Sequence, residues 1–173
     1  MAIIVSDTSP IHYLALIGEA HILPALYGRV IIPRKVFDEL QQPKTPQVVK
    51  AFASSLPTWV EVRSLSTPIA AGLSHLDGGE QEAITLAIEI QADTLLIDET
   101  KGRRAAKLHG LNVIGILGVL FDAAQAGLCN LPTSFEKLKQ TNFRAAESLY
   151  RNLIELYEQS VKAGQQVSEQ DET

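Results

Sequence analysis

Cysteine is almost absent from this 173-residue chain, which excludes an internal disulfide and a site built from several thiolates. A single residue, Cys129, fits a reducing, cytoplasmic setting. The longest apolar run, 113–121, is too short for a membrane-spanning helix, which needs about 20 residues. The first ten residues are apolar, but they contain Asp7 and no basic segment, so we expect no signal peptide.

Positive charge is also scarce. The 15 Lys and Arg residues are outnumbered by 20 Asp and Glu residues, which gives a formal net charge of −5. Three of the acidic residues lie in the last five positions, so the rest of the chain is closer to neutrality. No overall basic field attracts nucleic acid. A nucleic-acid function would therefore depend on a local basic patch or on metal ions.

The composition is otherwise that of a globular protein. Apolar residues make up 46% of the chain and charged residues 20%. The length suits one domain that builds its own core, and we expect this domain to span residues 1–162. Residues 163–173 are polar and lack apolar periodicity, so we expect a mobile tail there.

Short apolar runs alternate with helical patterns along the chain. Apolar runs that are rich in β-branched residues and bounded by turn residues are typical of strands buried on both faces. The predicted strands are 3–5, 30–32, 59–62, 95–97 and 113–114. Helices between consecutive strands predict a parallel sheet, and so an α/β fold.

Proline and glycine mark several predicted helix ends. Ser9 precedes Pro10, so we expect Ser9 to cap a helix that begins there. Gly28 is expected to end the helix before the second strand. Near the C-terminus, two further helices are predicted over 134–140 and 145–162.

Two aspartates follow predicted central strands. Asp7 comes shortly after 3–5, and Asp98 comes directly after 95–97. Ligands of open α/β sheets collect beyond the carboxyl ends of the strands, where both side chains are expected. Each Asp taken alone also fits a helix N-cap or a turn.

Two glutamates are placed by helical periodicity. In the helix after Gly79, Glu80 falls within roughly 40° of the centre of the apolar face, whereas Glu82 falls on the solvent face. An interaction with the helix dipole would explain the first-turn position of Glu80 but not its inward direction. Glu39 flanks the apolar face of its own helix, as a boundary carboxylate lying along the surface would also do.

The four acids Asp7, Glu39, Glu80 and Asp98 are thus aimed at one edge of the sheet. Carboxylates that gather without cations repel each other, which raises their pKa values, and burying an unpaired charge costs several kcal/mol. A divalent cation removes both costs, and an all-oxygen ligand set favours Mg²⁺ or Mn²⁺. Such an ion can activate water and neutralise charge at a phosphodiester.

Several segments around these acids resemble the PIN-domain family, and in particular the VapC-type toxin ribonucleases of toxin–antitoxin systems. The resemblance covers about residues 1–157. Its segments are VSDTSPIHYLALIG (5–18), VIIPRKVFDEL (30–40), LDGGEQEAITLA (76–87), LLIDETKGRRAAKLHGLNVIGILGVL (95–120) and NFRAAESLYRNLIELY (142–157). The last segment resembles the extra C-terminal helix of one PIN subgroup.

The resemblance implies a three-layer α/β/α fold with a central parallel sheet of about five strands. It also implies RNA cleavage that depends on Mg²⁺ or Mn²⁺. The implied catalytic and metal-binding residues are Asp7, Glu39, Glu80 and Asp98, with Ser9 supplying a hydroxyl near the metal. Glu99 is either an accessory ligand or a solvated loop residue. The implied partners are an RNA substrate, an antitoxin protein and a second copy of the chain, with no membrane.

Two positions depart from the family pattern. Leu96 stands two residues before Asp98, where many relatives carry Thr or Ser, and the third acid is Glu80 where many toxins have Asp. Leu96 and the modest charge keep a second hypothesis open, a non-catalytic PIN-like module that binds RNA or protein. A third hypothesis is a phosphatase or phosphoryl-acceptor domain that uses Asp7.

Basic residues follow Asp98 at a predicted helix start. This local patch contains Lys101, Arg103, Arg104 and Lys107, and Arg34 and Lys35 form a similar pair on another helix. Near the carboxylates they would hold RNA phosphates. A solvated helix face that contributes only solubility explains the patch equally well.

Overall fold

The computed structural model describes the backbone of residues 1–171 and the side chains of residues 1–165. The chain divides into two compact units, Met1–Ile116 and Leu117–Thr173, and each is described by itself. The first unit contains the sheet and all of the predicted site residues. The second unit is helical.

The first unit is built on a five-stranded sheet in the order β3-β2-β1-β4-β5. All four strand pairs are parallel, and β1 pairs with β4 so that Ser6 lies opposite Leu96. The strands are β1 (Ile4–Ser6), β2 (Val30–Pro33), β3 (Val60–Arg63), β4 (Thr94–Leu96) and β5 (Val113–Ile114). The parallel α/β fold expected from the alternation of elements is therefore confirmed.

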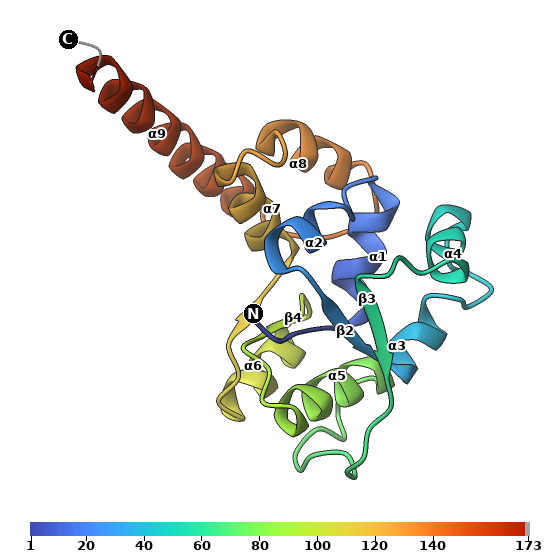
Figure 1. The fold of residues 1–173 in the computed structure, drawn as a ribbon. Helices are drawn as coiled ribbons and strands as arrows, with labels where there is room; N and C mark the ends of the chain where they lie inside the picture. The colour runs from blue at the N-terminus through green and yellow to red at the C-terminus, as the bar shows by residue number, and fades with distance from the viewer. Residues whose placement is uncertain (172–173) are drawn as a thin grey trace. The chain divides into compact units, whose positions relative to one another are not determined.

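Helices cover both faces of this sheet (Figure 1). On one face, α5 and α6 contribute to an apolar core with Val5, Ile31 and Leu95. Figure 1 shows α1 and α2 on the other side of the sheet from α5. The helices of this unit are α1 (Thr8–Leu16), α2 (Ile22–Tyr27), α3 (Arg34–Glu39), α4 (Gln47–Ser54), α5 (Gly78–Glu89) and α6 (Thr100–Leu108). Burial on both faces explains why the central strands are continuous apolar runs.

The second unit contains most of α7 (Ile116–Gln125), then α8 (Leu131–Lys139) and α9 (Glu147–Asp171). Phe135 of α8 and Tyr150 of α9 pack edge to face, with ring centroids 5.0 Å apart. The helix predicted to end at residue 162 continues to Asp171, which corrects that boundary. Gly164 does not stop the helix, because one glycine costs only about 1 kcal/mol within a segment of helix-favouring residues.

The start of α1 differs from its prediction. The helix begins at Thr8, so Asp7 occupies the N-cap position and Ser9 lies in the first turn. The prediction that Ser9 caps the helix is therefore wrong. Pro10 is tolerated at the third helical position because first-turn N–H groups have no acceptor within the helix. Gly28, in contrast, ends α2 with a positive φ of 76°, as expected.

Among the helices of the described residues, none combines the length and the apolar character that a bilayer span requires.

Candidate active site

Asp7 lies at the carboxyl end of β1, beside β4. Its backbone N–H donates to the Leu96 carbonyl at 2.9 Å, which ties it to the neighbouring strand. The residue is 4% exposed, and its Oδ1 has no hydrogen-bond partner. Although Asp7 is the N-cap of α1, its carboxylate makes no capping hydrogen bond. Burial raises the pKa of Asp7 well above its usual range, and Asp77, Glu80 and Glu39 add to the rise.

Asp98 follows β4 at the same edge of the sheet. Its Oδ1 accepts a hydrogen bond from the Ile116 backbone N–H at 2.8 Å, whereas its Oδ2 is buried without a partner. Burial raises the pKa of Asp98 to about 6, against the opposing effects of the Ile116 N–H and the Arg103 guanidinium. Asp98 is thus held in place through one oxygen and offers the other.

Glu80 is the third residue of α5 and takes part in a capping box. The Asp77 side chain accepts from the Glu80 N–H at 2.8 Å, and Glu80 Oε2 accepts from the Asp77 N–H at 3.2 Å. The other oxygen, Oε1, is buried without a partner. Burial, followed by the charge of Asp77, raises the pKa of Glu80 to about 7. The capping box explains the position of this inward-facing carboxylate, and the orphaned oxygen remains available.

Glu39 differs from the other three acids because both of its oxygens have donors. The Gly79 N–H donates to Oε1 at 3.0 Å, and the Thr8 hydroxyl donates to Oε2 in a short contact. Burial raises the pKa of Glu39, while the Thr8 hydrogen bond lowers it. Glu39 therefore joins the first turns of α1 and α5.

Glycines leave the space that three of these carboxylates occupy, and Gly115 does so for Asp98. A Cβ on Gly102 would lie 2.8 Å from Glu80 Oε1, and a Cβ on Gly79 would come still closer to the Glu39 carboxylate. Gly79 is the second residue of α5. In the structure, it admits a carboxylate to the N-terminus of α5.

Asp77 is a member of the cluster that sequence analysis missed. Its charge raises the pKa values of Asp7, Glu39 and Glu80. An Asp three residues before a Glu at a helix start is the pattern of a capping box, and this pattern could have identified it. The structure thus brings Asp77 together with three of the predicted acids. Asp98 lies one strand away, and the charged group that acts on its pKa within the described part of the chain is Arg103.

The two predicted accessory residues, Glu99 and Ser9, have fewer described interactions with the carboxylate cluster than the four acids. Glu99 is the exposed N-cap of α6, and its charge contributes to the raised pKa of Glu80. Thr8, next to Ser9 in the first turn of α1, donates its hydroxyl to Glu39, and the role of the Ser9 hydroxyl near a metal stays a prediction.

A metal ion fits the donor chemistry of this edge. The buried side-chain atoms that lack a hydrogen-bond partner among the described residues are three carboxylate oxygens, on Asp7, Glu80 and Asp98. Hard oxygen donors of this kind suit Mg²⁺ or Mn²⁺. As placed, however, no group of three or more His, Cys, Asp or Glu side chains within the described residues forms a metal-binding arrangement. Closing of the side chains around an ion would be needed.

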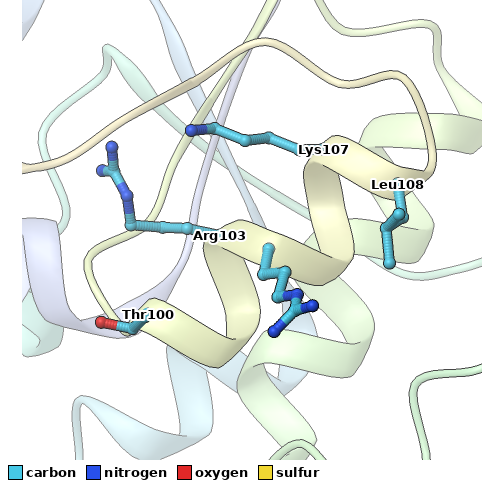
Figure 2. Close-up of a pocket in the computed structure, with 5 residues that line it drawn as sticks. Thr100, Arg103, Lys107 and Leu108 are labelled. Atoms are coloured by element: carbon cyan, nitrogen blue, oxygen red, sulfur yellow. The ribbon is translucent and has the colours of Figure 1, made fainter.

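A basic pocket lies on α6, next to Asp98. Figure 2 shows Arg103 and Lys107 reaching out on the same side of the helix, with Thr100 at its start. The pocket has a volume of about 390 Å³ and is lined by Thr100, Arg103, Arg104, Lys107 and Leu108. Arg103 Nη1 donates to the Ile97 carbonyl at 3.1 Å, which fixes its guanidinium near Asp98. Lys101 is exposed but does not line the pocket.

The other predicted basic pair is divided. Arg34 forms an ion pair with Asp38 at 3.3 Å and lies over the Phe37 ring, so it already has partners on its own helix. Lys35 lies against Gly78, and its charge lowers the pKa of Glu39. Lys35 is therefore the member of this pair that acts on the carboxylate cluster.

Comparisons with known proteins agree with the fold. The sequence model of the DUF3368 family, described as a PIN domain, matches residues 3–159. The structure resembles that of a PilT N-terminus domain protein from the hyperthermophilic archaeon Sulfolobus solfataricus P2. The TM-score is 0.50 and the identity 20%, over 83% of this chain and 99% of the other. No curated protein matches the chain. The match over nearly the whole sequence shows that the chain belongs to the PIN-domain family.

Proposed function

We propose that this protein is a Mg²⁺- or Mn²⁺-dependent endoribonuclease. PIN domains are generally nucleases, and the observation that carries the proposal is the set of three orphaned carboxylate oxygens on Asp7, Glu80 and Asp98. An unpaired buried carboxylate oxygen costs free energy, so a set of three at the ligand-binding edge of a sheet is explained by a cationic ligand.

In this proposal the acids, Glu39 and the basic residues of α6 have separate roles. Asp7, Glu80 and Asp98 would hold the ion, which would supply charge neutralisation at the phosphodiester and an activated water. Glu39 acts through Thr8 and Gly79, which it holds at the first turns of α1 and α5. The Ile116 N–H orients the Asp98 carboxylate, and Arg103, Arg104 and Lys107 would bind RNA phosphates beside it.

The test is cleavage of RNA by the purified protein with Mg²⁺ or Mn²⁺. We expect cleavage to stop in EDTA and to fall at least about 100-fold in Asp7→Asn, because a carboxylate ligand to the ion is lost. Circular dichroism should show that the variant remains folded. Cleavage that survives both EDTA and Asp7→Asn would contradict the proposed chemistry.

A non-catalytic RNA-binding module is the second candidate. Two observations favour it: the described acids do not form a three-ligand arrangement as placed, and Leu96, whose side chain is apolar and fully buried, offers no polar group to a substrate. RNA binding without hydrolysis across several metal ions would select this function. A phosphoryl-acceptor role is disfavoured because Asp7 is only 4% exposed.

The biological role that we propose is that of the toxin in a toxin–antitoxin pair, acting as a homodimer. Apolar side chains that remain exposed on α9 support a protein partner there, since Leu149 is 45% exposed, Leu156 53% and Val161 41%. Light scattering of the purified chain should give twice the monomer mass. Leu156→Glu should shift it to monomer if α9 forms the dimer contact.

A further inference from the structure

The pocket beside Glu39 has no role in the chemistry described so far. It has a volume of about 380 Å³ and is lined by Thr8, His12, Glu39, Gln42, Lys44, Thr45 and Asp77. Three of these residues connect it to the carboxylate cluster, since Thr8 follows Asp7 directly and Glu39 and Asp77 belong to the cluster itself. A ligand in this pocket would therefore lie next to the acids, on the side of Glu39.

Three polar side chains that have no role in the proposed cleavage chemistry line this pocket from separate elements. His12 comes from α1, while Gln42 and Lys44 come from the segment between α3 and α4. Within the described residues, none of these three side chains has a hydrogen bond or ion pair. Burial lowers the pKa of His12, so its ring is neutral at about pH 7 and offers one donor and one acceptor.

The wall of the pocket is fixed before any ligand binds. Lys50 Nζ donates to the Pro43 carbonyl at 2.7 Å, and the Thr45 N–H donates to the Gln42 carbonyl at 3.0 Å. The Thr45 hydroxyl donates to the Glu39 carbonyl at 3.3 Å. These bonds hold the segment 42–45 in one turn, so binding would not have to order it.

We propose that this pocket binds one nucleotide of a single-stranded RNA, with the base stacked on His12, its polar edge read by Gln42, and a phosphate held by Lys44. A neutral aromatic ring, an amide and one cation are the groups that proteins use to recognise unstacked bases and their backbone. The pocket volume lies in the range of small-ligand sites, and a single cation beside two acids does not suit a more highly charged anion.

This inference rests on the proposed function for its choice of ligand, and binding tests it separately from cleavage. Fluorescence anisotropy would follow labelled single-stranded U, C and A homopolymers of about 12 nucleotides in EDTA. We expect His12→Ala to weaken binding about 5- to 100-fold through lost stacking, and His12→Phe to restore most of that loss. Gln42→Ala should change the ranking of the three RNAs. Lys44→Ala should weaken all three by a similar factor and reduce the salt slope by about 1.

Matched controls remove the same side-chain types outside the pocket. His75→Ala, Gln47→Ala and Lys162→Ala should stay within about 2-fold of the unmodified protein, because none of these residues lines the pocket. Thermal melts would check that each variant is folded. Pocket variants that bind like their controls, or an unmodified protein that binds no RNA, would overturn the inference. If the pocket variants bind like their controls but the unmodified protein cleaves RNA, the pocket assignment is wrong and the proposed function stands. If RNA binding depends on the pocket but no RNA is cleaved, the pocket assignment stands and the proposed nuclease function is wrong.

Discussion

Two groups of carboxylates in the same sheet have opposite surroundings. On β3, Glu61 accepts from Arg63 Nε at 2.9 Å and from Arg29 Nη1 at 3.2 Å, and these partners lower its pKa. At the ends of β1 and β4, Asp7 is buried and Asp98 is half-buried, each has one buried oxygen without a partner, and the pKa values of both are raised. A carboxylate that serves surface stability has both oxygens paired with cations, whereas each of the strand-end aspartates keeps one oxygen without a partner. The difference indicates that the strand-end acids are retained for a ligand rather than for the fold.

The largest difference between the two groups should be in catalysis. Asp98→Asn is expected to lower the rate of RNA cleavage about 10³-fold, because it removes a charged donor where the ion would be bound. Glu61→Gln should leave the rate within about 2-fold. Single-turnover cleavage of a labelled RNA in Mn²⁺ measures both. Equal losses in the two variants would erase the functional distinction.

The two groups should also respond to pH with opposite signs. In EDTA, the raised pKa of Asp98, about 6, means that the folded protein binds this proton more tightly than the unfolded chain. Its contribution to stability is therefore full below about pH 4 and is lost by up to about 3 kcal/mol as the pH rises through about 6. Glu61 has a lowered pKa, so its contribution is present above about pH 4.3 and is lost as the pH falls.

Urea unfolding between about pH 4 and pH 7 would measure this contrast. Relative to the unmodified protein, Asp98→Asn should remove the loss on the alkaline side. Glu61→Gln should instead flatten the loss on the acidic side. The assignment of the raised pKa to Asp98 would be wrong if Asp98→Asn left the alkaline trend unchanged.

Metal ions should stabilise the protein through the acids of the candidate site, which include Glu80 on α5, and not through Glu61. At an ion concentration of 100 times Kd, linkage adds about 2.7 kcal/mol to the free energy of unfolding, which raises Tm by several degrees. Glu80→Gln should reduce this rise, because Glu80 contributes one of the orphaned oxygens. Glu61→Gln should retain it. Differential scanning calorimetry in Mn²⁺ and in EDTA gives the comparison, and an equal rise in both variants would argue against Glu80 as a ligand.

A smaller effect on stability is expected at Gly102, whose backbone lies against the Glu80 carboxylate. Gly102→Ala places a methyl group against Glu80 Oε1 and Ile97, which should cost about 1–2 kcal/mol and weaken the Mn²⁺-dependent rise in Tm. Gly164→Ala is the matched control, since a Cβ there has no atom within 4 Å and alanine favours the helix. If Gly102→Ala were as stable and as responsive to Mn²⁺ as this control, the space beside Glu80 would not matter.

The alternation of apolar runs and helical segments in the sequence predicted the parallel sheet and the positions of Asp7 and Asp98 beyond β1 and β4. It could do so because burial on both faces demands continuous apolar strands, and parallel strands end at the same edge. Helical periodicity likewise predicted that Glu80 faces inward, and the structure leaves it 4% exposed. These features depend on local spacing, which the sequence states directly.

Tertiary structure decided which oxygens have partners. Thr8 and Glu39 are 31 residues apart, and Gly79 and Glu39 are 40 apart, so no local pattern could show that both oxygens of Glu39 are engaged. The pocket of His12, Gln42 and Lys44 depends in the same way on α1 meeting the segment after α3. Sequence periodicity sets the direction of a side chain from its own element, but hydrogen bonding and burial depend on the elements that pack against it, and those contacts exist only in the folded chain.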